Sequence, residues 1–270
     1  MREEIVQFGD DNRLSGILTL SPEMVTDRPL VIFLNAGIVH HVGPNRLHVK
    51  LARALAEERY EVLRFDLSGL GESLPAPAGK GYEEQSIADT RQAIDMMQAR
   101  FGERPIVLAG ICSGADNSYR TALRDDRVTG LILLDPYAYQ NTTAQISDLA
   151  KRAQDPERWK RLAGRLLSGT EGAEDEEEIM EDDNDRIPPE REVFGADLQS
   201  LTQRGVSLLM LYTSSVRHLI NARNQFHQTF RDFDFADKLE VDVLSHVDHT
   251  YTELGAQKEL SQRLLNWLAV

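Results

Sequence analysis

The sequence lacks features that would cross-link the chain or anchor it in a membrane. It contains one cysteine, Cys112, so no disulfide can form within the chain. A lone thiol is typical of a reducing compartment, and we expect a cytoplasmic protein. No apolar run approaches the ~18 residues that a membrane-spanning helix needs. The first residues also lack the apolar core of a signal peptide, so we expect neither an anchor nor a secretion signal.

Basic residues are also scarce, with 30 Lys and Arg against 44 Asp and Glu, a net charge of −14. Nucleic acids and anionic membranes are bound through basic faces, so we expect neither as a partner. Ten of the acids lie between positions 171 and 185, a stretch without Lys or Arg. Such a run is typical of a solvated surface. It lacks the spacing of a calcium-binding loop, and we expect no metal or cofactor. The sequence leaves the oligomeric state open.

Hydrophobic patterning predicts an α/β fold. Residues 4–8 and 14–20 alternate as two strands around a turn. Continuous apolar runs follow, interrupted by segments of helical periodicity, and runs of this kind suit strands buried on both faces of a parallel sheet. Strands are expected at residues 30–34, 60–65 (which include the charged Glu61 and Arg64), 105–109 and 128–134, and the helical segments cover residues 45–58, 83–101 and 115–123. We therefore expect a mostly parallel, doubly wound sheet with an N-terminal hairpin.

This alternation breaks between residues 137 and 200, which contain no convincing strand. The strand pattern resumes at 206–212 and 239–244, and a helix is expected at 254–268. An insertion of this size between strands is typical of a cap over a site. The predicted organisation is a core of residues 1–136 and 201–270, with a helical cap at 137–200 that carries the acidic stretch.

The most informative segment is the pentapeptide from Gly110 to Gly114, which has Cys112 at its centre. It stands between a predicted strand and a predicted helix, the setting of a nucleophile elbow, G-x-S-x-G, with cysteine replacing serine. Glycines are required there because the strand and helix backbones approach closely. The helix N-terminus favours a thiolate. The alternative is a buried structural cysteine; Ser113 stands one position too late to be the nucleophile.

With these motifs the chain resembles the α/β-hydrolase superfamily over nearly its whole length apart from the cap. Four landmarks carry the resemblance, in the expected order: residues 35–37 (NAG), 65–73 (FDLSGLGES), the elbow, and 248–250 (DHT). More narrowly, it resembles bacterial serine-aminopeptidase-like and exosortase-associated hydrolases. The resemblance implies an α/β-hydrolase fold and nucleophilic catalysis at the elbow.

The resemblance also implies roles for particular residues. Cys112 would be the nucleophile and His249 the base that accepts its proton, with His246 as the nearest rival. Backbone N–H groups of Ser113 and of Gly37 and Ile38 would form the oxyanion hole. The residues beside that hole are candidates for substrate binding, with a surface role as the alternative: His40, His41 and Arg46.

The acid that orients the histidine is missing from its usual place. The loop after the strand that ends at Tyr212 begins Thr213-Ser214-Ser215 and has no carboxylate. Asp135 is the best substitute, because some relatives carry the acid at the end of the preceding strand. Its alternative role is to cap a turn before Pro136. Asp248, adjacent to His249, is expected to point elsewhere.

These features predict a cysteine-dependent hydrolase that cleaves an ester, thioester or amide through an acyl-enzyme on Cys112. The substrate would be a small-molecule or carrier-bound acyl compound. Two alternatives stay open: an acyltransferase or cyclase that uses the same thioester intermediate, and a non-catalytic binding protein on a hydrolase fold.

Overall fold

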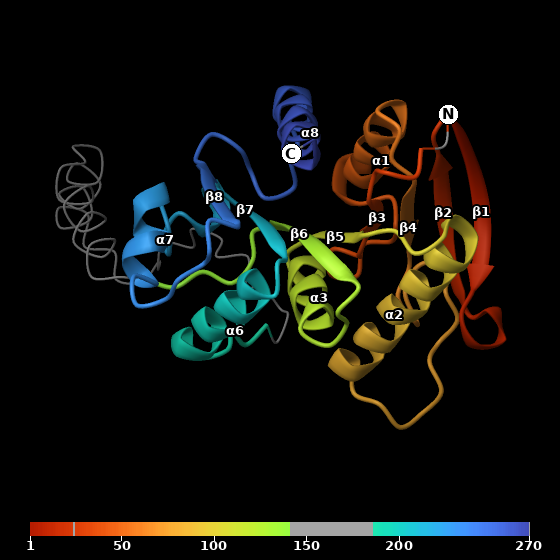
Figure 1. Cartoon of the computed structure of the whole chain (residues 1–270), viewed down its shortest axis with the longest axis horizontal. Coiled ribbons are helices and arrows are strands. Elements are labelled where there is room, and N and C mark those ends of the chain that lie inside the picture. Colours follow the sequence, from red (N-terminus) through yellow and green to blue (C-terminus); the bar gives the residue numbers. More distant parts are fainter. Residues whose placement is uncertain (24, 141–185, 270) are drawn as a thin grey trace, which may run out of the picture.

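The computed structural model describes residues 1–23, 25–140 and 186–269, and its core is an eight-stranded sheet (Figure 1). The strand order is β1-β2-β4-β3-β5-β6-β7-β8. Their bounds are β1 (Arg2–Phe8), β2 (Leu14–Leu20), β3 (Leu30–Phe33), β4 (Val62–Phe65), β5 (Ile106–Ile111), β6 (Val128–Leu134), β7 (Ser207–Thr213) and β8 (Leu239–Leu244).

The strand directions confirm the predicted mixed topology. The hairpin β1–β2 is antiparallel and joins the sheet antiparallel to β4, whereas all pairs from β4 to β8 are parallel. Strands β3, β4 and β5 are buried along their whole length, as the apolar sequences of β3 and β5 predicted; β4 is buried although it contains Arg64. Because parallel strands end at one edge, the loops after β3, β5, β6 and β8 gather there.

Helices cover both faces of this sheet. Figure 1 shows α1 and α8 on one face and α2, α3 and α6 on the other, with α7 beside β8. Each face has its own apolar core, one built around Leu55 and Leu260 and the other around Ile94 and Phe194. The helices are α1 (Leu47–Glu57), α2 (Tyr82–Phe101), α3 (Ser113–Ala122), α6 (Arg191–Gln203), α7 (Arg223–Thr229) and α8 (Leu254–Leu268).

The predicted cap differs at its C-terminal end. Residues 191–200, which we assigned to the cap, belong to α6, and its Phe194 and Leu198 are fully buried in the core against the sheet. An amphipathic helix that covers a sheet face has the same pattern as one in a cap, so the sequence alone did not separate them. The rest of the expected cap, with the acidic stretch, lies mostly within 141–185, outside the described residues.

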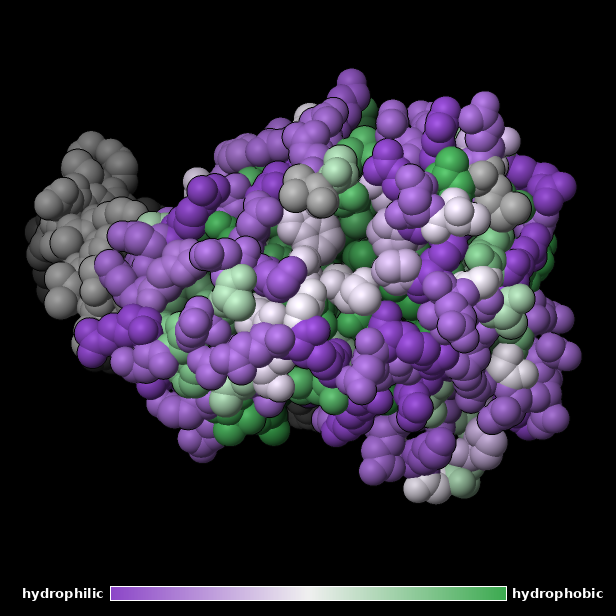
Figure 2. Space-filling view, viewed as in Figure 1, coloured by the Kyte–Doolittle hydropathy of each residue, from purple (hydrophilic) through white to green (hydrophobic). Residues whose placement is uncertain are grey.

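The surface of the molecule is mainly polar, as expected when helices cover both faces of the sheet. In the view of Figure 2 the molecule is mainly hydrophilic, and hydrophobic residues form small groups between polar ones. In the described part of the chain, no helix is both long and apolar enough to cross a bilayer.

Candidate active site

Cys112 occupies the sharp turn between β5 and α3. Its φ of 57° and ψ of −123° are strained for a residue with a Cβ. Its N–H still continues the sheet ladder, bonding the carbonyl of Leu134 at 2.9 Å, while its carbonyl accepts the first bonds of α3 from Ala115 and Asp116. The side chain is 7% exposed. The turn thus holds the sulfur at the N-terminus of α3, as the elbow pattern predicted.

The flanking glycines are required by close packing. A Cβ on Gly110 would lie 2.2 Å from the carbonyl carbon of Gly114, and a Cβ on Gly114 would lie 2.5 Å from the carbonyl oxygen of Asn35. Both contacts are with backbone, which cannot move aside cheaply. The elbow is therefore packed directly on the loop that follows β3.

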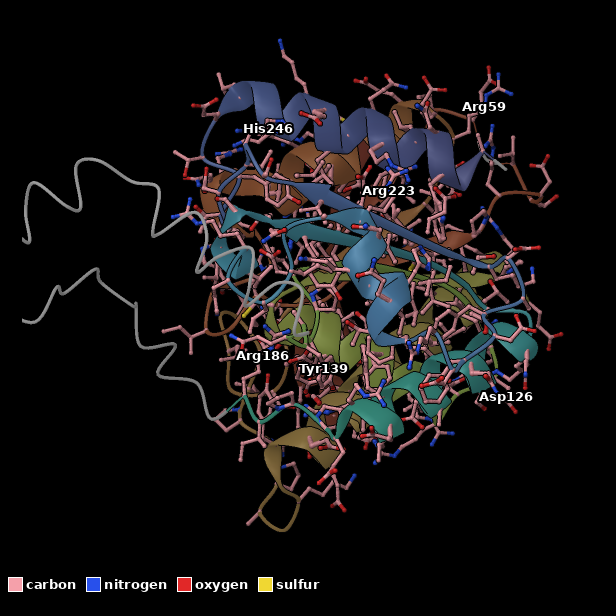
Figure 3. All side chains as sticks on the ribbon, turned by 90° about the vertical axis from the view of Figure 1, so that its left-hand side faces the viewer. Arg59, Asp126, Tyr139, Arg186, Arg223 and His246 are labelled. Carbon is pink, nitrogen blue, oxygen red and sulfur yellow. The ribbon has the colours of Figure 1, made fainter. Side chains whose placement is uncertain are left out.

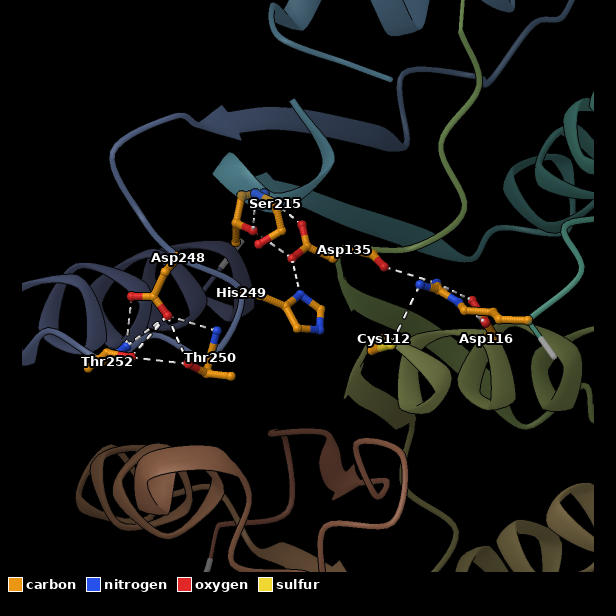
Figure 4. A network of polar contacts seen from close by, with 10 residues as sticks. Cys112, Asp116, Asp135, Ser215, Asp248, His249, Thr250 and Thr252 are labelled. Atoms are coloured by element: carbon orange, nitrogen blue, oxygen red, sulfur yellow. Dashed lines mark hydrogen bonds and ion pairs between the residues drawn. The ribbon is translucent and has the colours of Figure 1, made fainter. Parts of the chain in front are cut away.

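His249 lies beside Asp135, as Figure 4 shows. Its Nδ1 is 2.6 Å from Oδ2 of Asp135, although the two residues are 114 positions apart in the sequence. The Cys112 side chain also acts on the charge of this imidazole and favours its protonated form. The structure therefore brings together the three residues that the sequence proposed for nucleophile, base and acid.

Asp135 is fully buried and its carboxylate is fully used. Oδ1 accepts the backbone N–H of Thr213 at 2.6 Å, and Oδ2 accepts the Thr213 hydroxyl at 2.6 Å as well as the His249 ring. The residue has a φ of 47°, which turns the chain at the end of β6. The loop that lacks a carboxylate, after β7, supplies donors to Asp135 in its place.

The surroundings of His249 favour its charged form. The hydrogen bond to Asp135, then the interaction with Cys112, outweigh burial and raise the pKa of His249 from 6.5 to about 10. A histidine held by a buried carboxylate on Nδ1 presents Nε2 to the nucleophile. The arrangement can therefore take up and hold a proton from the thiol.

The two rivals to this assignment lie elsewhere. The side chain of His246 is 63% exposed and bonds Glu259, and Figure 3 shows it beside α8, well away from Arg186. Asp248 turns away from the ring of its neighbour, as expected. Its carboxylate accepts the N–H groups of Thr250 and Thr252 and so shapes the loop that carries His249.

The expected oxyanion donors are placed unequally. The N–H of Gly37 donates to the Ser113 hydroxyl at 2.7 Å, which joins the loop after β3 to the elbow. Ser113 begins α3, so its own N–H belongs to the first turn, whose N–H groups have no partner within the helix. Ile38 is 86% exposed and lies away from the packed part of this loop.

The three residues suggested for substrate binding make other contacts. Nδ1 of His41 is 2.7 Å from Oδ2 of Asp66, while His40 is exposed and packs edge-on against the His41 ring. Arg46 is exposed; its backbone N–H bonds the carbonyl of Gly43, whereas its side chain makes no hydrogen bond within the described residues. In that part of the chain, none of the three bonds to Cys112, His249 or Asp135.

Asp66 explains why the loop after β3 is held. Its fully buried carboxylate accepts the side-chain amide of Asn35, the N–H and ring of His41, and the N–H of Glu72. Burial opposes its ionisation, but these hydrogen bonds outweigh burial and lower the pKa of Asp66. Asp66 belongs to the second sequence landmark, whose role is thus to fix the loop that carries Gly37.

One residue at the site was missed by the sequence reasoning. Nη1 of Arg186 lies 3.7 Å from the Cys112 sulfur, and its Nη2 donates to the carbonyl of Asp135 at 2.9 Å. It also forms a two-pronged ion pair with Asp116. The sequence held a weak signal, since Arg186 is the first basic residue after the acidic stretch and Asp116 stands one helical turn after Cys112.

The described residues contain no group of His, Cys, Asp and Glu side chains that could hold a metal ion. The site presents a thiol, an imidazole supported by a buried carboxylate, and the first N–H groups of a helix, which are groups that nucleophilic catalysis uses.

Comparison with solved structures shows where this architecture recurs. The chain is similar to an esterase from Pyrococcus furiosus, at 17% identity and a TM-score of 0.60, covering 99% of this chain and 91% of that one. It is also similar to a serine hydrolase homologue from Coxiella burnetii, at 18% identity and a TM-score of 0.57, covering 98% and 96% of the two chains. A lidless serine hydrolase from Xanthomonas campestris matches at 15% identity and a TM-score of 0.57, with 99% and 96% covered.

These likenesses show the α/β-hydrolase fold. Among curated proteins none matches the sequence. The family described as "Serine aminopeptidase, S33" matches residues 28–250, which include the elbow, Asp135 and His249. That family is named for serine, whereas the elbow here carries cysteine. The chain therefore belongs to the serine aminopeptidase S33 family of α/β hydrolases, with Cys112 at the elbow position.

Proposed function

We propose that the protein is a cysteine-dependent hydrolase that cleaves an ester, thioester or amide through an acyl-enzyme on Cys112. The observation that carries the proposal is the Asp135–His249 contact at 2.6 Å, together with the strained elbow cysteine, whose side chain favours the charged form of the imidazole. Nucleophile, base and orienting acid are the minimum set for acyl transfer.

In the proposed reaction, the Cys112 proton passes to Nε2 of His249, and the sulfur attacks the carbonyl carbon of the substrate. The developing oxyanion accepts the N–H groups of Ser113 and Gly37, the latter released from the Ser113 hydroxyl that accepts it in the free protein. His249 then donates its proton to the leaving group. Water, activated by the same imidazole, hydrolyses the thioester and restores the thiol.

The same intermediate supports a second outcome. A thioester is reactive towards amines and alcohols as well as water, so acyl transfer or cyclisation needs only an acceptor in place of water. We propose hydrolysis as the basal reaction, with a small-molecule or carrier-bound acyl compound as the substrate. Hydrolysis and acyl transfer are distinguished by adding an amine and measuring the ratio of the free acid to the amide.

The proposal is tested by trapping the acyl-enzyme. The protein is mixed with p-nitrophenyl acetate, quenched in acid, digested, and examined by mass spectrometry. We expect acetyl on the peptide that contains Cys112, absent in Cys112→Ala and retained in Ser113→Ala. An acetyl group on Ser113, or no acetylated peptide together with no release of p-nitrophenol, would contradict the proposal.

A further inference from the structure

Arg186 directs one end of its guanidinium at the elbow sulfur. Four of its five N–H groups have partners: Nε and one on Nη2 bond the Asp116 carboxylate, the other on Nη2 bonds the carbonyl of Asp135, and one on Nη1 points to Sγ of Cys112 at 3.7 Å. The ring of Tyr137 lies 5.1 Å below the guanidinium. These contacts hold the guanidinium from three sides in one orientation.

This ion pair is buried. The side chain of Arg186 is 15% exposed and that of Asp116 is 3% exposed. Burying two charges costs much of what their attraction returns, so a buried pair is weak evidence for a role in stability. Its position against the sulfur suggests another role.

The orientation of the pair gives the sulfur a positive neighbour. Asp116 binds the edge formed by Nε and Nη2, whereas Nη1 at the opposite side faces Cys112. The sulfur therefore contacts the cationic end of the pair, with the carboxylate behind it. This charge adds to the N-terminus of α3 and to the His249 imidazole. The hydrogen bond from an N–H to sulfur is weak when the sulfur is a thiol and becomes charge-assisted when it is a thiolate.

The same contacts exclude a simpler role for Arg186. A substrate carboxylate or phosphate would be bound by the two-pronged edge of a guanidinium. In Arg186 the edge formed by Nε and Nη2 is occupied by Asp116, and the edge formed by Nη1 and Nη2 has lost its second Nη2 N–H to the carbonyl of Asp135, so neither edge is free; the pair is also neutral overall. The N–H groups on Nη1 are the ones directed towards the sulfur.

We propose that Arg186 is a further catalytic residue, which stabilises the Cys112 thiolate through Nη1, and that Asp116 is its positioning residue. The proton leaves Sγ for Nε2 of His249, so charge is balanced between the sulfur and the imidazole, and Arg186 donates a hydrogen bond without losing its proton. The proposal rests on the proposed nucleophile, Cys112. It extends the constellation of sulfur, imidazole and carboxylate by a cation that the sequence motifs did not indicate.

The test measures the charge on sulfur rather than turnover. Because Cys112 is the only cysteine, alkylation by iodoacetamide followed by mass spectrometry reports that thiol alone. The rate is measured from pH 5 to 10 in wild type, Arg186→Gln and Asp116→Asn. Arg120→Gln is the matched control, because Arg120 lies on α3 and bonds the Tyr137 hydroxyl at 2.8 Å without bonding to Cys112.

We expect Arg186→Gln to move the midpoint of the alkylation profile to higher pH and to slow alkylation at pH 6 about tenfold, the size of one charge-assisted hydrogen bond. Asp116→Asn keeps the shape of the partner and leaves the cation unbalanced, so its midpoint moves to lower pH. Arg120→Gln leaves the midpoint unchanged. Midpoints that move in opposite directions indicate an electrostatic effect. If the ion pair only held the structure, losing either partner would move the midpoint in the same direction.

Arg186→Gln leaves a buried carboxylate without its partner, so the double variant Arg186→Gln/Asp116→Asn serves if the single one does not fold. Its midpoint also rises, since the nearer charge is lost. An unchanged midpoint in the arginine variants, or shifts of the same sign in Arg186→Gln and Asp116→Asn, overturns the proposal. Alkylation needs no substrate, so a protein that fails to form an acyl-enzyme but shows these opposite shifts would refute the proposed hydrolase and retain the role of Arg186.

Discussion

Replacing Asp135 with Asn separates the charge of the acid from its shape. The carboxylate accepts three hydrogen bonds, and the one from the Thr213 backbone is fixed by the sheet. The amide oxygen of Asn must face that N–H, which turns its NH₂ group towards Nδ1 of His249. The imidazole must then accept on Nδ1 and carry its proton on Nε2. A ring in this tautomer must give up its hydrogen bond to Asn before Nε2 can take the proton of Cys112.

The loss of activity in Asp135→Asn is limited by the free energy of the hydrogen bond that disappears, the one between Asp135 and His249. One hydrogen bond to a charged group contributes about 1.5–3 kcal/mol, which corresponds to roughly a tenfold to hundredfold fall in kcat/KM. In serine enzymes the same change costs up to ~10⁴, because the wrong tautomer leaves the hydroxyl without a base. A thiol ionises far more readily than a hydroxyl, so part of the nucleophile persists. We therefore expect the smaller loss.

The measurement is kcat/KM for p-nitrophenyl acetate in wild type, Asp135→Asn, His249→Ala and Thr213→Val. The last variant is the control, because it removes one hydrogen bond from Asp135 and leaves the charge, and we expect it to lose less than about tenfold. His249→Ala should lose much more than Asp135→Asn. Equal losses in those two would show a full triad acid and refute the argument from sulfur; if neither loses activity, the base is misassigned.

Other variants test the remaining parts of the site. Cys112→Ala should abolish turnover and Cys112→Ser should leave weak or no activity; full activity in Cys112→Ala would move the site elsewhere. The pKa of His249 rises from 6.5 to about 10 on folding, so the stability it contributes is fully present below pH 6.5 and is lost as pH rises through 10. The gap in urea midpoint between wild type and His249→Gln should therefore shrink over that interval, and a constant gap would contradict the shift. Gly114→Ala should destabilise the fold by at least about 1–3 kcal/mol in urea unfolding, since its Cβ would meet a backbone oxygen at 2.5 Å. Asp66→Asn should lower kcat with little change in the alkylation rate, because it loosens the loop that carries Gly37 and leaves the thiol in place; a matching fall in alkylation would place its effect on the elbow.

Features encoded in contiguous residues could be predicted from the sequence. The parallel strands were visible as apolar runs because both their faces are buried, and the elbow was visible because its glycines must allow backbone atoms to approach within a few ångströms. The terminal hairpin and the position of His249 after the last strand followed from local order in the same way. The C-terminal end of the cap was not predictable, because the apolar stripe of α6 would be the same whether the helix packed on the sheet or in a cap.

Contacts between distant segments were decided only by the tertiary structure. Asp135 could have capped a turn before Pro136 or oriented the histidine, and the choice depended on where a loop 114 residues later returned to the sheet. His41 was a candidate for substrate binding from its position beside the predicted oxyanion hole, and only the structure shows that the buried Asp66 holds its ring. Arg186 has no motif around it, and its contact with Cys112 exists only because the chain returns to the elbow after residue 185. The sequence by itself determined the sheet, the elbow and the nucleophile candidate, since each depends on neighbours along the chain. The partners of that nucleophile were determined by the meeting of loops at one sheet edge, where charge and hydrogen bonding join residues that no spacing relates.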